Sequence, residues 1–312
     1  MSLTIGTITG THRVVIRVGC DMTLVCPTDT VALLTVKPLP DPHRPVKDER
    51  LEFDEFIQPQ MFNDYFGNIV HRANLRQGPN RIRHDALIEV PLLSDRADSV
   101  GDHTPLEAIP PQLLRYTLPS RYCESDKLLG LAARQFGHIV DPGRRAAAIC
   151  DWVHENIEYR YGSGRPDISA FEIIERGFGV CRDFAHCTVA LCRSMNLPAR
   201  YVTGHLPDIG YLDPGSPMDF HAYAEVYIGG RWHTFDARYN VPRVGRVKIA
   251  HGLDATDCAF TTTYGPAELS NFEVWAYQID PDEVAVGDPV DLSKRLDGTP
   301  EIRLSGLGGL RV

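Results

Sequence analysis

One change of pattern, between Leu92 and Pro119, divides the chain into two parts. Before it, segments rich in Val, Ile, Leu and Thr are separated by clusters of Pro, Asp and Gly, which is typical of short antiparallel strands. The stretch itself is polar and proline-rich and lacks the periodicity of a regular element. We therefore expect a β-rich N-terminal domain (residues 1–95, a sandwich or barrel), a linker (96–118) and a second domain (119–312). The expected strands of the first domain are His12–Val18, Met22–Cys26, Val31–Val36 and Arg81–Val90.

Composition and charge narrow the class of protein. With 43% hydrophobic and 23% charged residues the chain is suited to form a globular core rather than a disordered polymer. The formal net charge of −9 argues against nucleic acid or an anionic membrane surface as a partner, because such binding needs a positive face. No signal-peptide pattern and no 18-residue apolar stretch occur, so cytoplasmic residence is expected. The eight cysteines are then expected to be mostly buried thiols rather than disulfides.

Helix signals begin directly after the proline-rich stretch. Ser125 is a candidate N-cap for a helix over Lys127–Phe136 that Gly137 ends. Asp141 can cap a second helix, in which apolar residues recur at helical spacing through Ala146–Ile157. Both helices are expected to pack against one core.

A short helix and a glycine-containing loop come next. Ser169 and Glu172 form a capping-box pair before a helix over Phe171–Arg176, which ends at Gly177. The loop after it leads to Cys181, at the start of a helix predicted to reach about Met195.

Strands are expected to follow these helices. Four segments have strand character, and together with the helices they predict an α+β domain with helices followed by an antiparallel sheet. These segments are Ala199–Gly204, His221–Ile228, Arg231–Ala237 and Phe272–Ile279.

Cys181 is the candidate nucleophile. A thiol attacks as its thiolate, and unpaired N–H groups at a helix start favour that ion. Free cysteines are more often buried structural residues, so position alone does not decide between the two interpretations. The choice between them depends on the residues that surround Cys181.

A predicted hairpin supplies the candidate partners. Gly229-Gly230 is typical of a two-residue turn and predicts that Ile228 lies opposite Arg231. With that register, His221 and Asp236 are diagonal neighbours on one face of the sheet. A carboxylate that holds one ring nitrogen leaves the other to accept a thiol proton, so we predict a triad of Cys181, His221 and Asp236.

The three motifs of this triad together resemble the transglutaminase-like superfamily, which has a papain-type fold. They are Gly177-Phe178-Gly179-Val180-Cys181-Arg182-Asp183-Phe184-Ala185, His221-Ala222-Tyr223 and Trp232-His233-Thr234-Phe235-Asp236. The run from Leu118 to Asp126 is similar to the bacterial branch described as cysteine proteases. The resemblance implies Cys181 as nucleophile, His221 as general base and then acid, and Asp236 as the residue that orients the ring.

We therefore expect a thiol hydrolase, a cysteine peptidase or amidase that acts on a peptide or protein substrate through an acyl-enzyme. Two alternatives stay open: an amine acyltransferase with the same triad, and a non-catalytic binding module with a degenerate site. The chain has no recognisable calcium loop of the kind that animal transglutaminases would imply. The N–H of Cys181 is a candidate donor to the oxyanion.

Other candidate residues have structural explanations of equal weight. Asp183 and His186 could tune or cap the helix of Cys181, and Tyr223 and Trp232 could form walls of a substrate groove. The sequence has no CxxC pair and no HExxH motif, so neither a metal nor another cofactor is expected.

Overall fold

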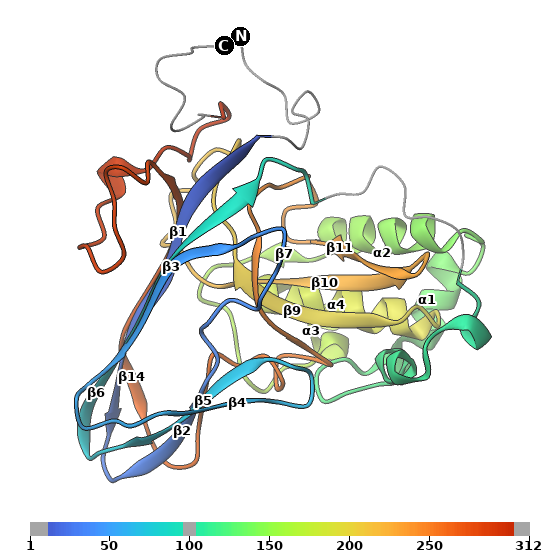
Figure 1. Cartoon of the computed structure of the whole chain (residues 1–312). Helices are drawn as coiled ribbons and strands as arrows, with labels where there is room; N and C mark the ends of the chain where they lie inside the picture. Colours follow the sequence, from blue (N-terminus) through green and yellow to red (C-terminus); the bar gives the residue numbers. More distant parts are fainter. Residues whose placement is uncertain (1–11, 96–103, 303–312) are drawn as a thin grey trace.

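The computed structural model describes residues 12–95 and 104–302 (Figure 1). Two four-stranded antiparallel sheets form the β-rich part, and a third sheet with four α-helices forms the other part. The protein thus combines helices with antiparallel sheet, as the sequence predicts.

Long strands dominate the first sheet, whose order is β14-β1-β6-β3. Its strands are β1 (Arg13–Cys26), β3 (Val46–Phe53), β6 (Gly78–Pro91) and β14 (Glu268–Ile279). The segments His12–Val18 and Met22–Cys26, expected as two strands, belong to the single strand β1, because Gly19 to Asp21 continue the ladder without a turn. Gly19 is required there, since a Cβ would lie 2.2 Å from the carbonyl oxygen of His84.

The second sheet has the order β13-β2-β5-β4. Its strands are β2 (Thr30–Leu34), β4 (Gln60–Asn63), β5 (Ile69–Leu75) and β13 (Thr261–Thr263).

One expectation about the strands is wrong. We expected Phe272–Ile279 in the sheet of the second domain, but it forms part of β14 and pairs with β1. Strand propensity marks a segment as extended and carries no information on its partner. Here Phe272 pairs with Met22 and Ile279 with Val15, near the other end of the chain. The division of the chain into domains at residues 96–118 stays a prediction.

The stretch expected to be an irregular linker contains regular structure. Residues 96–103 lie outside the described residues, but two 3-10 helices follow: η2 (Leu106–Ala108) and η3 (Pro111–Thr117). Tyr116 of η3 is buried and makes an edge contact with Trp232, at 5.2 Å between ring centroids. This packing, which has no signature in local sequence, orders the segment.

The third sheet, β11-β10-β9-β12, has helices against it (Figure 1). The helices are α1 (Ser125–Phe136), α2 (Pro142–Asn156), α3 (Ala170–Arg176) and α4 (Cys181–Ser194). The strands are β9 (Ala199–His205), β10 (His221–Ile228), β11 (Arg231–Phe235) and β12 (Val247–Gly252). A separate parallel pair is formed by β7 (Glu158–Tyr159) and β8 (Phe178–Gly179). A short 3-10 helix, η4 (Leu292–Lys294), follows β14.

The predicted helix ends are largely confirmed. Asp141 caps α2 by accepting a hydrogen bond of 2.6 Å from the N–H of Arg144. Glu172 accepts one of 2.8 Å from the N–H of Ser169, and Gly177 ends α3 with φ 77°. At α1, Ser125 is the first helical residue rather than the cap.

One buried cluster joins the sheets to the helical part. Met22 and Ile82 of the first sheet belong to the same apolar cluster as Ala185 of α4 and Ala222 of β10. Cys181 packs against this cluster, so α4 begins where the two parts meet. The described residues contain no helix with the length and hydrophobicity of a membrane span.

Candidate active site

Cys181 is the first residue of α4, as predicted. The turn before it depends on Asp183, whose carboxylate accepts a hydrogen bond of 2.9 Å from the N–H of Val180. A Cβ on Gly179 would lie 2.6 Å from an oxygen of that carboxylate, so glycine is needed at this position. Asp183 therefore caps the helix that carries Cys181.

The predicted hairpin register is confirmed. The turn residues Gly229 and Gly230 have φ of 59° and 81°, and Ile228 lies opposite Arg231. His221 begins β10, and Asp236 directly follows β11. Nε2 of His221 and Oδ2 of Asp236 are 2.7 Å apart, the contact that the register predicts.

Both groups are buried, and their charges are coupled. Burial alone would raise the pKa of Asp236, but His221 and Arg246 together lower it well below its usual range. Burial lowers the pKa of His221, an effect that Asp236 opposes and Arg246 adds to. At neutral pH the pair is therefore a carboxylate and a neutral imidazole, whose Nδ1 can accept a proton.

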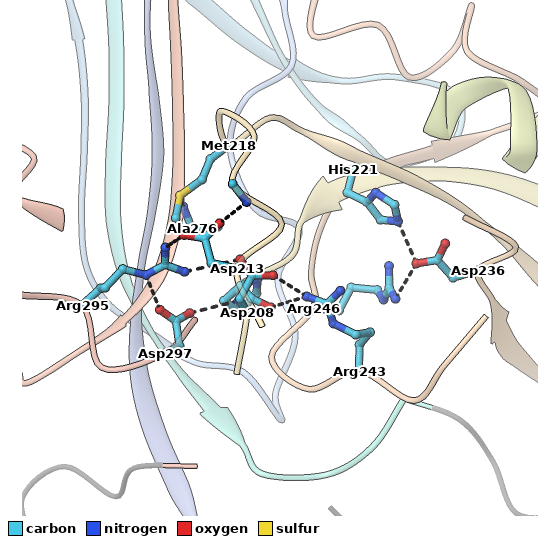
Figure 2. Close-up of polar contacts among 12 residues, drawn as sticks. Asp208, Asp213, Met218, His221, Asp236, Arg243, Arg246, Ala276, Arg295 and Asp297 are labelled. Atoms are coloured by element: carbon cyan, nitrogen blue, oxygen red, sulfur yellow. Dashed lines mark hydrogen bonds and ion pairs between the residues drawn. The ribbon is translucent and has the colours of Figure 1, made fainter. Parts of the chain in front are cut away.

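Arg246 is a site residue that the sequence analysis missed. Its guanidinium donates a hydrogen bond of 2.9 Å to Oδ2 of Asp236 (Figure 2). It donates another, of 2.8 Å, to Asp95. Its Cζ also lies 4.3 Å from the ring centroid of Tyr223. An arginine in a loop has no local signal that would connect it with a carboxylate ten residues earlier.

A pocket of about 480 Å³ contains both Cys181 and His221 in its wall. Sγ of Cys181 lies 3.9 Å from the carbonyl oxygen of Phe220, the residue before His221. Among the described residues, Sγ and the ring of His221 form no hydrogen bond. Thiol and imidazole thus open on one pocket, without the direct contact that proton transfer requires.

The ionisation of the thiol differs from the expectation. Burial, with smaller contributions from the charges of Asp219 and Asp236, raises the pKa of Cys181 to about 12. Hydrogen bonds from the N–H groups of Ala222 and Arg182 act in the opposite direction. The helix start does face the sulfur, but desolvation outweighs it, so the resting side chain is a thiol.

The remaining candidates, His186, Tyr223 and Trp232, are not in the wall of this pocket. His186 is stacked on Tyr122 and accepts a hydrogen bond from the N–H of Ala255, and burial lowers its pKa to about 3. Tyr223 packs beside His221, and Trp232 packs against Tyr116. Neither aromatic residue lines this pocket.

A second network holds the pocket wall that precedes His221. Arg295, which follows η4, pairs with Asp208, Asp213 and Asp297 at 3.3, 2.6 and 2.9 Å (Figure 2). Arg243 also pairs with Asp208, at 2.8 Å. The loop between β9 and β10 is therefore fastened to the segment after β14. In the part of the chain that the structure describes, no group of three or more His, Cys, Asp or Glu side chains is placed to hold a metal ion.

Known proteins resemble this chain in sequence and in fold. Residues 130–237 match the family described as the transglutaminase-like superfamily. A solved structure described as "a putative cysteine protease" from Cytophaga hutchinsonii is 32% identical with a TM-score of 0.77, over 87% of this chain and 93% of that one. An uncharacterized protein of Mycobacterium leprae, ML0607, is 24% identical over 67% of this chain and 77% of its own length. The matched region runs from α1 to the residue after Asp236, and the chain belongs to the transglutaminase-like superfamily.

Proposed function

We propose that the protein is a thiol hydrolase that cleaves a peptide or related amide bond through an acyl-enzyme on Cys181. The observation that carries the proposal is the 2.7 Å contact between His221 and Asp236 in the wall of the pocket that also contains the Cys181 thiol. The name of the similar Cytophaga protein supports the same class of chemistry.

Cys181 and His221 carry out the steps of the proposed reaction. Nδ1 of His221 takes the proton of the thiol as Sγ attacks the carbonyl carbon, and the N–H of Cys181 donates to the oxyanion. His221 then protonates the leaving amine, and the acyl group stays on sulfur as a thioester. Water, deprotonated by His221, releases the carboxylic acid and restores the thiol.

The attack has to bring Sγ and Nδ1 together. Because the pKa of Cys181 is raised to about 12, proton transfer takes place with substrate bound rather than in advance. Asp236 stabilises the imidazolium that forms.

Transfer of the acyl group to an amine instead of water uses the same steps, and the family name makes it the second candidate. To separate the two, the protein is incubated with a glutamine-containing protein and a tagged amine. Release of new amino termini supports hydrolysis, whereas incorporation of the tag supports transfer.

The same incubation tests whether the triad acts at all. Cys181→Ala and His221→Ala should each lower the rate by about a thousandfold or more. Cys187→Ala, a buried cysteine of the same helix outside the pocket, is the matched control. Equal rates in wild type and Cys181→Ala would refute the proposal.

Cytoplasmic residence is part of the proposal. All eight cysteines are free, and seven of them are buried, whereas Cys181 is partly exposed. Free thiols in this number persist in a reducing compartment.

A further inference from the structure

The pocket beside Cys181 carries an uneven set of charges. Its wall contains the carboxylates of Asp208, Asp213 and Asp219 and the guanidinium groups of Arg238 and Arg295. Arg295 is already paired with two of these carboxylates, Asp208 and Asp213. Asp219 is the carboxylate of the wall that has no cation within ion-pair distance in the described structure.

Asp219 is also the wall carboxylate next to the reacting atoms. It precedes Phe220, whose carbonyl oxygen is 3.9 Å from Sγ of Cys181. Its own carboxylate accepts a hydrogen bond of 2.7 Å from the N–H of Phe220, which fixes its position. Its negative charge raises the pKa of the Cys181 thiol.

A negative charge in this place opposes formation of the thiolate. If the pocket only had to favour the Cys181 thiolate, a neutral residue at position 219 would favour it more than an aspartate does. The arrangement becomes favourable when a cation arrives with the substrate, because the cation pairs with Asp219 and removes the charge that opposes ionisation.

The remaining wall suits such a cation. Tyr159, Tyr161 and Tyr239 line the pocket, and aromatic faces attract cations. The one guanidinium of the wall without a carboxylate partner among the described residues, Arg238, is stacked on Tyr159 and Tyr239, at 3.5 and 4.9 Å from their ring centroids. Arg238 thus already covers Tyr159 and Tyr239, and among the described residues Tyr161 is the tyrosine of the wall on which no cation is stacked, so its exposed ring is the face left for a substrate cation.

We propose that Asp219 selects substrates that carry a cationic group, an ammonium or guanidinium, beside the scissile amide, and that pairing of this group with Asp219 assists ionisation of Cys181. This inference rests on the proposed function, since it concerns the same thiol. It adds a substrate class and a residue that determines specificity.

The first test needs no substrate. Cys181 of the full chain is modified with two methanethiosulfonates, one with a trimethylammonium group and one with a sulfonate group. In wild type the cationic reagent should react at least about tenfold faster than the anionic one, after correction for their rates with free cysteine. Asp219→Asn should reduce this ratio to about two, whereas Asp219→Glu should largely keep it. Glu155→Gln, which removes an exposed charge of α2 outside the pocket, should leave it unchanged.

The second test uses the reaction. Amide substrates that differ only in lysine, norleucine or glutamate beside the scissile bond are compared by kcat/KM. Wild type should prefer lysine over norleucine by about tenfold or more, and Asp219→Asn should remove the preference while it keeps activity toward norleucine.

The outcomes separate the two proposals. Turnover without a preference for cations, or a reagent ratio that Asp219→Asn does not change, overturns the role of Asp219 and leaves the hydrolase intact. No turnover of any substrate, with wild type equal to Cys181→Ala, overturns the hydrolase. A charge ratio that still depends on Asp219 would then support an electrostatic pocket around Cys181 on its own.

Discussion

Arg246 donates a hydrogen bond of 2.9 Å to Oδ2 of Asp236, the same oxygen that contacts His221. A buried cation beside this carboxylate keeps it ionised and holds it toward the ring. The same cation lowers the pKa of His221, which favours a neutral base at the pH of the cell. Arg246 thereby acts on the thiol through two other residues.

Replacement of Arg246 by methionine should move the pH profile. Without the guanidinium the pKa of His221 rises, so the acid limb of kcat/KM should shift to higher pH, and the rate at neutral pH should fall by about ten- to a hundredfold. Because Asp95 and Asp236 lose their buried partner, the free energy of unfolding should also fall by about 3–5 kcal/mol. Kinetics between pH 5 and 9 and urea unfolding measure the two effects.

Arg246→Lys separates the effect of the positive charge on the pH profile from the effect of the mutation on stability. Lysine keeps a positive charge, so the acid limb should stay near that of wild type even where the protein is destabilised. A profile that shifts equally in both variants would contradict the electrostatic role of Arg246.

The close approach of Gly179 and Asp183 predicts that their mutations do not add. Gly179→Ala places a Cβ 2.6 Å from an Asp183 oxygen and should displace the carboxylate from the N–H of Val180. Asp183→Ala removes the same cap, at a cost of about 1–2 kcal/mol. The double variant should be about as stable as the less stable single variant, as measured by urea unfolding. Additive losses would show that the two residues act independently.

The hairpin turn depends on two glycines with positive φ, Gly229 and Gly230. Gly230 has φ 81°, where a β-branched residue is strained, and a Cβ added there would meet no atom within 4 Å outside its chain neighbours. Gly230→Val should therefore destabilise by about 1–2 kcal/mol through the backbone alone. Gly229→Asn is the matched control, because asparagine tolerates φ near 59°. Thermal unfolding of both variants checks the difference.

His205 should make the protein sensitive to acid. Both ring nitrogens are buried without a hydrogen-bond partner in the described structure, and burial lowers the pKa of His205 to about 3. The unfolded chain binds this proton below about pH 6.5, so the stability from the neutral ring is present above 6.5 and declines as the pH falls toward 3.

His205→Leu should reduce that decline. At pH 5, about 1.5 units below the unfolded pKa, His205 removes about 2 kcal/mol that the leucine variant keeps. The free energy of unfolding of both proteins, measured by urea at pH 5 and pH 7.5, gives the comparison. Parallel pH dependences would contradict a neutral buried ring.

Local rules predicted the parts of the site that depend on local geometry. The Gly229-Gly230 turn determines which residues of β10 and β11 face each other, and the contact between His221 and Asp236 follows from counting along the strands. Glycine, capping residues and helical spacing likewise placed Cys181 at the start of α4. The catalytic roles of these residues stay predictions.

Other parts depend on burial and on distant partners, which local rules do not contain. The raised pKa of Cys181 comes mainly from desolvation, and desolvation follows from how the whole chain packs. Arg246 reaches Asp236 across a loop, and Arg295 reaches Asp208 from the segment after β14. Each is an ordinary surface-type residue in the sequence and becomes a site residue through tertiary structure.

The place of β14 beside β1 has a consequence for synthesis on the ribosome. One edge of β1, from Val15 to Val25, has no partner until Glu268–Ile279 has been translated. An unpaired strand edge can form hydrogen bonds with other chains, so this edge of β1 is exposed to aggregation for most of the time that the protein is being translated. Leu292 and Arg295, which lie in the wall around Cys181, are translated after this strand, so the thiol receives its complete surroundings only once β14 has been made.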